Sequence, residues 1–545
     1  MSRHPGKIAL ALTLAVVAAT TVTTPAAIPD TVAISTGRLS GVALPSGVRA
    51  FKGIPFAAAP VGDLRWKEPQ PPDKWEGVRK AEQFSNVCVQ PSQLNRVPNN
   101  VTVDLPDSPK TSEDCLYLNV WTAAGRANER LPVMVWIFGG AYTEGGGSSK
   151  HNDGENLAKK GVVLVTFNYR LGPFGFFAHP ELTSESGHNA SGNQALMDAI
   201  ATLRWVKTNI AAFGGDPGNV TIFGESAGAA MVGGLVGSPV ANGLFQRAIS
   251  ESGAWMGLGM GPMTPRAQAE RQQVLTPAGR GGRGRGDASQ PASPPPPPPP
   301  LPPLAELRAR STEEVVKTLR GSGMIVDGWI VPEDLSITFA NGKQNAVDVI
   351  AGSNKDEHTS LGGNVAFRDT MMWAMRLFAE RQTAAGKRAY WYFFTHEPPV
   401  EPGGKDLKAT HATEIVYVFN NLWAPRVIPD ISSPKLAIAS ERDRKMADEM
   451  SSYWVNFAKN GDPNGRGLPN WPRFKDRNAP PHILGEIKEH PGADVLNAYD
   501  AKYAEVLRTL PPRATDGAGN FQLPMSQLPK ACTNPFGCWE LVVGR

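Results

Sequence analysis

The segment Val220–Ala230 has the residue types and spacing to supply a nucleophile. Its sequence, VTIFGESAGAA, places Ser226 in a Gly-x-Ser-x-Gly arrangement, after a strand-like apolar run and before a helix-like run of small residues. A strand–turn–helix element of this kind exposes the serine oxygen above the edge of a sheet. The first amides of such a helix also stabilise negative charge that develops beside it. We therefore predict that Ser226 is a nucleophile.

A nucleophilic serine needs a general base, and the base needs an acid that orients it. In the fold that uses this turn, the chain order is serine, then Asp or Glu, then histidine. The histidines that follow the motif before the final stretch include His358, His396, His411 and His482. Asp356 and Glu357 end a loop that follows the strand-like run 347–351, where open α/β sheets bind ligands. Spacing alone does not choose between these two acids, nor between His396 and His411.

A Gly-rich loop could hold the negative charge of a tetrahedral intermediate. The apolar run Leu131–Phe138 is followed by Gly139-Gly140-Ala141-Tyr142 and then by Gly145-Gly146-Gly147. A loop this rich in glycine can turn its backbone amides toward the serine. We expect these amides to form an oxyanion hole together with the amide of Ala227.

Apolar runs alternate with helical patterns along the chain, which indicates the elements that position these residues. The runs that predict strands buried on both faces are 131–138, 162–167, 220–223, 347–351 and 389–394. Residues 194–212 and 442–459 carry apolar residues at helical spacing, and a Gly-Asp-Pro sequence follows each. This alternation predicts an α/β fold with a mostly parallel central sheet, flanked by helices on both faces.

The composition and the N-terminal sequence limit the classes of protein to which the chain can belong. The chain has 545 residues, 41% hydrophobic and 19% charged, with a formal net charge of +4. This balance predicts no general attraction to nucleic acid or to an anionic membrane. Arg3 and Lys7 precede the apolar run Ile8–Ala19, and small residues follow as far as Ala27. Residues 1–27 therefore predict a signal peptide, and hence a secreted or periplasmic protein without a membrane span.

Export permits disulfides, and the chain has 4 cysteines. Their spacing is not that of a zinc site. The economical pairing is Cys88 with Cys115 and Cys532 with Cys538. Four free thiols in a cytosolic protein are the alternative.

One segment cannot pack into a core. Residues 276–303 contain a Gly/Arg-rich stretch at 279–286 and an unbroken run of prolines at 294–300. This composition predicts a flexible stretch followed by a stiff polyproline II rod. We interpret it as a disordered surface insertion in a single catalytic domain that spans residues 28–545. The alternative is a segment that binds RNA or an SH3-type partner.

Together these motifs resemble the type-B carboxylesterases, the cholinesterase and carboxylesterase branch of the α/β-hydrolases. Further matching segments lie in order along residues 31–510, among them 51–57, 112–121, 168–172, 213–217, 354–357 and 457–463. The resemblance implies an α/β-hydrolase fold and a small-molecule ester as substrate. It implies no metal and no other cofactor.

Residue by residue, the resemblance implies a triad of Ser226, Glu357 and His411. It thereby selects Glu357 over Asp356 and His411 over His396, which spacing left open. It further implies oxyanion donors on Gly140, Ala141 and Ala227, a disulfide Cys88–Cys115, and Glu225 near the site.

Two departures from the family pattern affect the expected site. Ala141 stands where many relatives have glycine, so a methyl group crowds the oxyanion hole and a positive φ becomes unfavourable. No aromatic residue lies between Cys88 and Cys115, where cholinesterases place a tryptophan that holds choline. The second departure argues against a cholinesterase.

We therefore expect a secreted serine hydrolase that cleaves small to medium carboxylic esters through an acyl-enzyme intermediate. The alternative is a catalytically weak or non-enzymatic adhesion or interaction protein on the same fold. Loss of the serine or the histidine would favour that alternative, and both residues are present.

Overall fold

The structure is a computed structural model that describes residues 28–90, 111–253, 261–273, 300–360, 365–397, 408–423 and 439–510. The predicted signal peptide lies outside these residues. So do Cys532, Cys538 and most of the predicted insertion, whose last residues, 300–303, are described.

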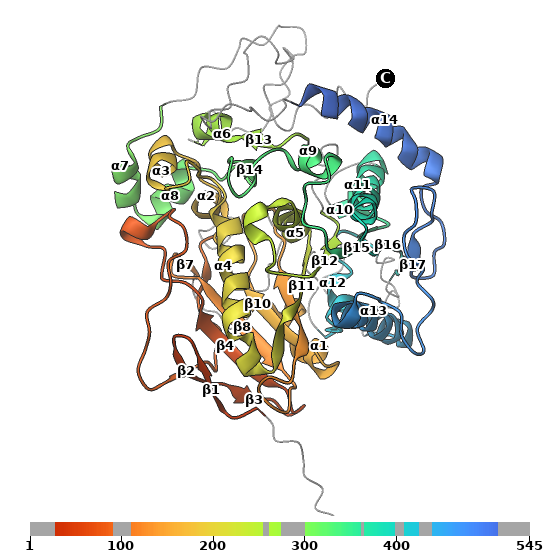
Figure 1. The fold of residues 1–545 in the computed structure, drawn as a ribbon, viewed down its shortest axis with the longest axis horizontal. Helices are drawn as coiled ribbons and strands as arrows, with labels where there is room; N and C mark the ends of the chain where they lie inside the picture. Colours follow the sequence, from red (N-terminus) through yellow and green to blue (C-terminus); the bar gives the residue numbers. More distant parts are fainter. Residues whose placement is uncertain are drawn as a thin grey trace, which may run out of the picture.

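A ten-stranded sheet forms the centre of the molecule (Figure 1). In spatial order its strands are β17 (His482–Leu484), β16 (Ala389–Phe394), β15 (Asp348–Asn354), β12 (Arg247–Glu251), β11 (Gly215–Glu225), β9 (Leu131–Ile137), β10 (Val163–Phe167), β8 (Tyr117–Thr122), β4 (Arg49–Pro55) and β3 (Val42–Ala43). Neighbours from β17 to β10 pair in parallel, and the pairs from β10 to β3 are antiparallel. The predicted mostly parallel sheet is confirmed.

The remaining strands form smaller sheets. They are β1 (Thr31–Ile34), β2 (Gly37–Ser40) and β5 (Val78–Lys80) in one sheet, β6 (Val87–Cys88) and β7 (Thr111–Ser112) in a second, and β13 (Thr264–Pro265) and β14 (Ile325–Val326) in a third. The helices are α1 (Glu155–Lys159), α2 (Gly172–Gly175), α3 (Pro180–Glu185), α4 (Gln194–Asn209), α5 (Ala227–Gly237), α6 (Arg266–Gln272), α7 (Leu304–Ala309), α8 (Thr312–Thr318), α9 (Leu335–Ala340), α10 (Glu357–Ser360), α11 (Val365–Ala384), α12 (Ile415–Val418), α13 (Glu441–Asn460) and α14 (Ala493–Thr509). No helix among them is long and apolar enough to cross a membrane.

The predicted strands and helices occur close to their expected positions, with one clear difference. β11 begins at Gly215, upstream of the expected run, and its register shifts between Gly215 and Val220. The turn residues Asp216-Pro217-Gly218 lie in this irregular part, where Pro217 has no amide to donate to a ladder. From Val220 onward the strand pairs regularly with β9 and leads directly into Ser226.

Two adjacent residues of β12 show that helices cover both faces of the sheet. Successive side chains of a strand point to opposite faces. Ser250 Oγ lies 3.9 Å from Met375 Sδ of α11, whereas Glu251 accepts a 2.8 Å hydrogen bond from Trp454 Nε1 of α13. α5 and α11 therefore pack on one face of the sheet and α13 packs on the other. The prediction that helices flank both faces is confirmed.

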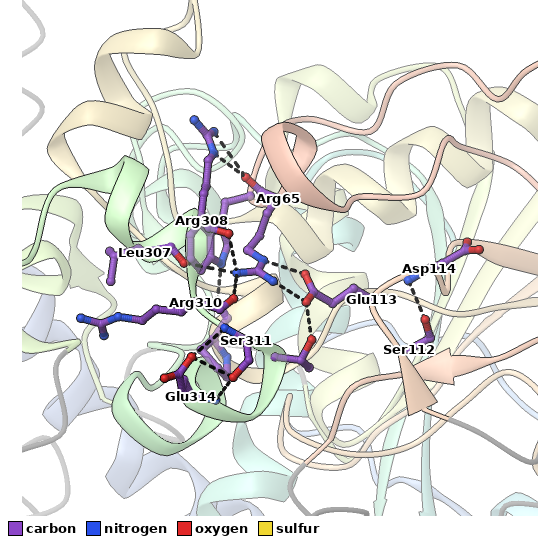
Figure 2. Close-up of polar contacts among 12 residues, drawn as sticks. Arg65, Ser112, Glu113, Asp114, Leu307, Arg308, Arg310, Ser311 and Glu314 are labelled. Atoms are coloured by element: carbon purple, nitrogen blue, oxygen red, sulfur yellow. Dashed lines mark hydrogen bonds and ion pairs between the residues drawn. The ribbon is translucent and has the colours of Figure 1, made fainter.

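The chain that follows the predicted insertion is fixed to the body by Arg65 (Figure 2). This guanidinium donates to both carboxylate oxygens of Glu113, at 2.7 and 2.6 Å. It also donates to the carbonyls of Leu307, Arg308 and Arg310, so it caps the C-terminal end of α7. α8 then starts with a capping box between Ser311 and Glu314.

Candidate active site

Ser226 lies at the point where β11 ends and α5 begins. Its backbone has φ 55° and ψ −123°, a strained conformation for a residue with a side chain. Its amide donates to the Glu251 carbonyl of β12 at 2.9 Å, which ties the turn to the sheet. The predicted strand–turn–helix element is confirmed, and it projects the serine side chain beyond the carboxyl ends of the parallel strands.

The glycines around Ser226 are required because other backbone segments pass close to them. A Cβ on Gly228 would lie 2.0 Å from the Ile137 carbonyl oxygen, and one on Gly224 would lie 2.6 Å from the same atom. A Cβ on Gly253, beyond β12, would lie 2.1 Å from the Ser226 carbonyl oxygen. The turn can therefore pack against β9 and the end of β12 only where these residues lack side chains.

His411 connects Ser226 to Glu357. The ring Nε2 lies 2.8 Å from Ser226 Oγ, and the ring Nδ1 lies 2.6 Å from Glu357 Oε2. The other oxygen of Glu357, Oε1, accepts the backbone amide of Asn354 at 2.8 Å. Glu357 is fully buried and His411 is 5% exposed. The three groups thus form a continuous hydrogen-bonded chain in the order that nucleophilic catalysis requires.

The structure places the two alternatives, Asp356 and His396, in other roles. Asp356 Oδ2 accepts the amide of Ala409 at 3.1 Å, and its own amide donates to the Ala409 carbonyl at 2.8 Å. Asp356 therefore holds the loop that carries His411. The ring nitrogens of His396 face Asp443 and Glu486, at 2.9 and 3.1 Å. These contacts of Asp356 and His396 are made to groups other than Ser226.

A second layer of polar residues fixes the His411 loop. Asn354 Nδ2 donates to the Thr410 carbonyl at 2.8 Å and also bonds the carboxylate of Glu414. Ser252 Oγ donates to the other oxygen of Glu414 at 3.4 Å. Ser252 was not among the residues predicted from the sequence. It directly follows β12, a strand that was not predicted either, so no sequence signal indicated a role for it.

Buried carboxyl groups surround His411. Glu225 Oε1 lies 3.2 Å from His411 Nε2, so Glu225 is near the site as expected. Burial lowers the pKa of His411, but Glu225, Glu357 and Glu414 outweigh this effect, and the net shift is upward. Burial raises the pKa of Glu225 well above its ordinary value, and the neighbouring glutamates raise it further against the opposing effect of His411. The imidazolium form of His411 is therefore strongly stabilised here.

The Gly-rich loop after β9 lies against the nucleophilic turn. A Cβ on Gly139 would lie 2.7 Å from the Glu225 carbonyl oxygen and 2.9 Å from Ser226 Cβ. The amides of Gly140, Ala141 and Ala227 have no hydrogen-bond acceptor among the described residues. These donors are therefore available near Ser226, as an oxyanion hole requires.

Ala141 adopts the backbone conformation that its side chain makes unfavourable. Its φ is 51°, that of Tyr142 is 64°, and Gly140 has φ 111°. A non-glycine residue in the left-handed region costs about 1–2 kcal/mol. The loop therefore makes a left-handed turn at a residue that has a side chain, at the cost of this strain.

The Cys88–Cys115 disulfide is present, with a Cα–Cα distance of 5.0 Å. The second expected bridge, Cys532–Cys538, lies outside the described residues. Within the described part of the chain, no cluster of three or more His, Cys, Asp or Glu side chains has the geometry to hold a metal ion.

Known proteins are similar to this chain along most of its length. Residues 29–371 and 360–500 match the sequence model of the Carboxylesterase family. Fumonisin B1 esterase of Sphingopyxis macrogoltabida is 35% identical over 472 residues, which cover 79% of this chain and 82% of that protein. Para-nitrobenzyl esterase of Bacillus subtilis is 32% identical over 478 residues, which cover 81% of this chain and 91% of that protein.

Solved structures agree with the fold. A para-nitrobenzyl esterase structure has a TM-score of 0.64 and 31% identity, covering 82% of this chain and 93% of that one. A carboxylesterase of Geobacillus stearothermophilus has a TM-score of 0.64 and 32% identity, covering 84% of this chain and 96% of that one. These neighbours have the α/β-hydrolase fold, and the expectation of that fold is confirmed.

Proposed function

Because this chain belongs to the carboxylesterase family and is a carboxylic-ester hydrolase, we propose that it acts through a triad of Ser226, His411 and Glu357. The observation that supports this most strongly is the hydrogen-bonded chain from Glu357 Oε2 through His411 to Ser226 Oγ, with distances of 2.6 and 2.8 Å. The complete set of groups is what an enzyme, rather than an adhesion protein on the same fold, requires.

In the first step, Ser226 Oγ attacks the carbonyl carbon of the ester. His411 Nε2 takes the hydroxyl proton as the C–O bond forms, and Glu357 stabilises the resulting imidazolium through Nδ1. The charge that develops on the carbonyl oxygen is held by the amides of Gly140, Ala141 and Ala227. Removing one such donor costs about 3–4 kcal/mol in known hydrolases.

The tetrahedral intermediate then collapses and the bond to the alcohol breaks. His411 gives its proton to the leaving alkoxide, which departs as the alcohol and leaves an acyl group on Ser226 Oγ. A water molecule, deprotonated by the same imidazole, attacks the acyl carbon, and the carboxylic acid leaves as Ser226 recovers its proton. Every proton in this cycle passes through His411, so no step requires a metal or an organic cofactor.

The substrate is a small to medium carboxylic ester, which the enzyme hydrolyses outside the cytosol. The names of two relatives, fumonisin B1 esterase and para-nitrobenzyl esterase, support organic esters of this range. The Cys88–Cys115 disulfide supports secretion or export to the periplasm, because such bonds persist in oxidising compartments.

Hydrolysis of a series of p-nitrophenyl esters by wild type and by Ser226→Ala tests the triad. We expect Ser226→Ala to lose at least about 10⁴-fold in kcat while the protein remains folded. Mass spectrometry should find a fluorophosphonate probe on Ser226 in the wild type and no adduct in the variant. Hydrolysis by Ser226→Ala at the wild-type rate, or an adduct on another residue, would contradict the proposal.

A further inference from the structure

Two buried carboxamides hold the Gly-rich loop at its far end. Gln90 Oε1 accepts the amide of Gly145 at 3.0 Å, and Gln90 Nε2 donates to the Gly145 carbonyl at 2.9 Å. Two residues further on, Asn168 Oδ1 accepts the amide of Gly147 at 2.9 Å. Gln90 is fully buried and Asn168 is 6% exposed. We call these two side chains the carboxamide brace.

The carboxamide brace also contacts the backbone at both ends of the disulfide. Gln90 Nε2 donates to the Cys88 carbonyl at 3.1 Å, and Asn168 Nδ2 donates to the Cys115 carbonyl at 3.2 Å. The disulfide joins Cys88 to Cys115, whose Cα atoms lie 5.0 Å apart. Each carboxamide thus connects one cysteine to one glycine of the loop.

The held end of the loop is in direct contact with the end that carries the oxyanion donors. The amide of Glu144, which precedes Gly145, donates to the Gly140 carbonyl at 3.1 Å. A Cβ on Gly140 would lie 2.1 Å from the Glu144 carbonyl oxygen. A displacement of Gly145 would therefore also displace Gly140, because one tight turn connects the two residues. The brace cannot be replaced by side chains of the loop, since a Cβ on Gly145 would lie 2.5 Å from the ring of Phe138.

We propose that Gln90 and Asn168 are positioning residues for the oxyanion hole, and that the Cys88–Cys115 disulfide influences catalysis through them. This inference rests on the proposed function, because it assigns a purpose to the loop that holds Gly140 and Ala141. The brace orients the loop before substrate binds, so the donors need no rearrangement when charge develops on the ester oxygen.

Gln382 provides a matched control for Gln90. It is also a fully buried glutamine, and its side chain makes two hydrogen bonds to the backbone where that of Gln90 makes three: it accepts the Val347 amide at 3.2 Å and donates to the Asn345 carbonyl at 3.1 Å. It lies in α11 beside the start of β15, at the opposite end of the parallel strands from Ser226. Replacing either glutamine by methionine removes comparable hydrogen bonds while keeping the side-chain length.

The test compares Gln90→Met, Gln382→Met and wild type in p-nitrophenyl ester hydrolysis, with the melting temperature measured on each. We expect both variants to lose similar thermal stability. Only Gln90→Met should lose kcat, by about 10- to 100-fold, because the oxyanion-hole amides are displaced. Its KM should stay about unchanged, because the rest of the substrate site is retained. Its affinity for a trifluoromethyl ketone, which forms a hemiketal oxyanion on Ser226, should weaken by a similar factor.

The disulfide is tested by combining Cys88→Ser and Cys115→Ser with Gln90→Met. If the disulfide acts through the brace, the loss of kcat in the triple variant should be smaller than the product of the two separate losses, since groups in one pathway are not additive and only Asn168 still connects Cys115 to the loop. Losses that multiply would overturn the coupling. If the serine variants do not fold, Asn168→Leu replaces them and should show the same selective loss of kcat.

Equal kcat for Gln90→Met and wild type, or an equal loss in Gln382→Met, would overturn the positioning role. The Ser226→Ala variant, assayed in parallel, separates this result from failure of the proposed function. If Ser226→Ala is inactive and Gln90→Met retains wild-type kcat and ketone affinity, the triad stands and only the brace is wrong.

Discussion

Among the described residues, two buried histidines contact carboxylates, and they differ in what the second ring nitrogen faces. Both nitrogens of His396 face carboxylate oxygens, on Asp443 and Glu486. One nitrogen of His411 faces the carboxylate of Glu357, while the other lies 2.8 Å from the Ser226 hydroxyl and 3.2 Å from Glu225 Oε1. Of the two rings, that of His411 is therefore the one that contacts a hydroxyl with which it could exchange a proton.

The surroundings of the two histidines agree with this difference. Asp443 is part of a capping box that starts α13, and it also accepts the hydroxyl of Tyr417 at 2.7 Å. The His396 site therefore joins β16, α12 and α13 as a structural connection. His411 lies on a loop held by Asp356 and Asn354, beyond the ends of the parallel strands. We conclude that the contact with the Ser226 hydroxyl makes His411 the candidate for catalysis, and that burial alone does not distinguish it from His396.

The largest expected effect comes from replacing the histidine that contacts Ser226. His411→Gln should lower kcat by about 10⁴- to 10⁶-fold, because Ser226 loses its proposed general base. The melting temperature should change little in comparison. Stopped assays at high enzyme concentration measure the residual rate, with Ser226→Ala as the reference. Retention of more than a tenth of wild-type kcat would contradict the proposed role of His411.

The reverse pattern is expected for the structural histidine. His396→Gln should lower the free energy of unfolding by about 3 kcal/mol, because the buried carboxylate of Asp443 loses its partner. The kcat at a temperature where the variant is folded should stay within about twofold of wild type, since His396 contacts no residue of the triad. Urea unfolding and ester hydrolysis on the same sample measure the two quantities. A large loss of kcat without loss of stability would place His396 in the catalytic machinery.

The contribution of the His396 site to stability should be lost at acidic pH and retained at neutral and alkaline pH. Burial raises the pKa of Asp443, but hydrogen bonds from His396, Tyr417 and Ser440 outweigh this effect and lower the pKa below its ordinary value. A group with a depressed folded pKa contributes stability above its unfolded pKa of about 4, and this contribution is lost as pH falls through the folded value. The stability difference between wild type and Asp443→Asn should therefore shrink as the pH falls below about 4. Urea titrations at a series of acidic pH values measure it, and a difference independent of pH would contradict the assignment.

The smallest effect concerns the pH dependence of His411, the proposed general base. Glu225 is one of the carboxylates that raise the pKa of His411. The proposed mechanism requires the neutral imidazole, so the rate should rise as His411 loses its proton. Glu225→Gln should therefore move the acidic limb of the kcat/KM profile to lower pH, since the imidazolium is less stabilised. The same substitution at Glu486, which contacts His396, serves as the control and should leave the limb in place.

The local motifs could be interpreted from the sequence because they depend on neighbouring residues. Ser226 was predicted from the apolar strand before it and the small residues after it, and both are confirmed in β11 and α5. The Cys88–Cys115 bridge and the mostly parallel sheet were also predicted correctly. The expected strain at Ala141 is present as well, since the loop keeps a positive φ there.

The partners of Ser226 could not be chosen from spacing alone. Asp356 and Glu357 are adjacent, and only the path of the loop after β15 decides that Glu357 reaches His411 while Asp356 reaches Ala409. Resemblance to a family selected the same residues without supplying the reason. The brace formed by Gln90 and Asn168 gave no signal in the sequence, because its hydrogen bonds join residues that are distant in the chain.

The sequence by itself determined the strand–turn–helix element at Ser226, several of the strands and helices, and the class of chemistry, because each depends on residue types within a few positions of one another. The tertiary structure decided which acid and which histidine meet Ser226, and which carboxamides hold the oxyanion loop. These choices depend on the packing of β11, β12 and β15 side by side, which brings loops far apart in the chain to one edge of the sheet. At that edge, a difference of one residue changes which side chain reaches the imidazole.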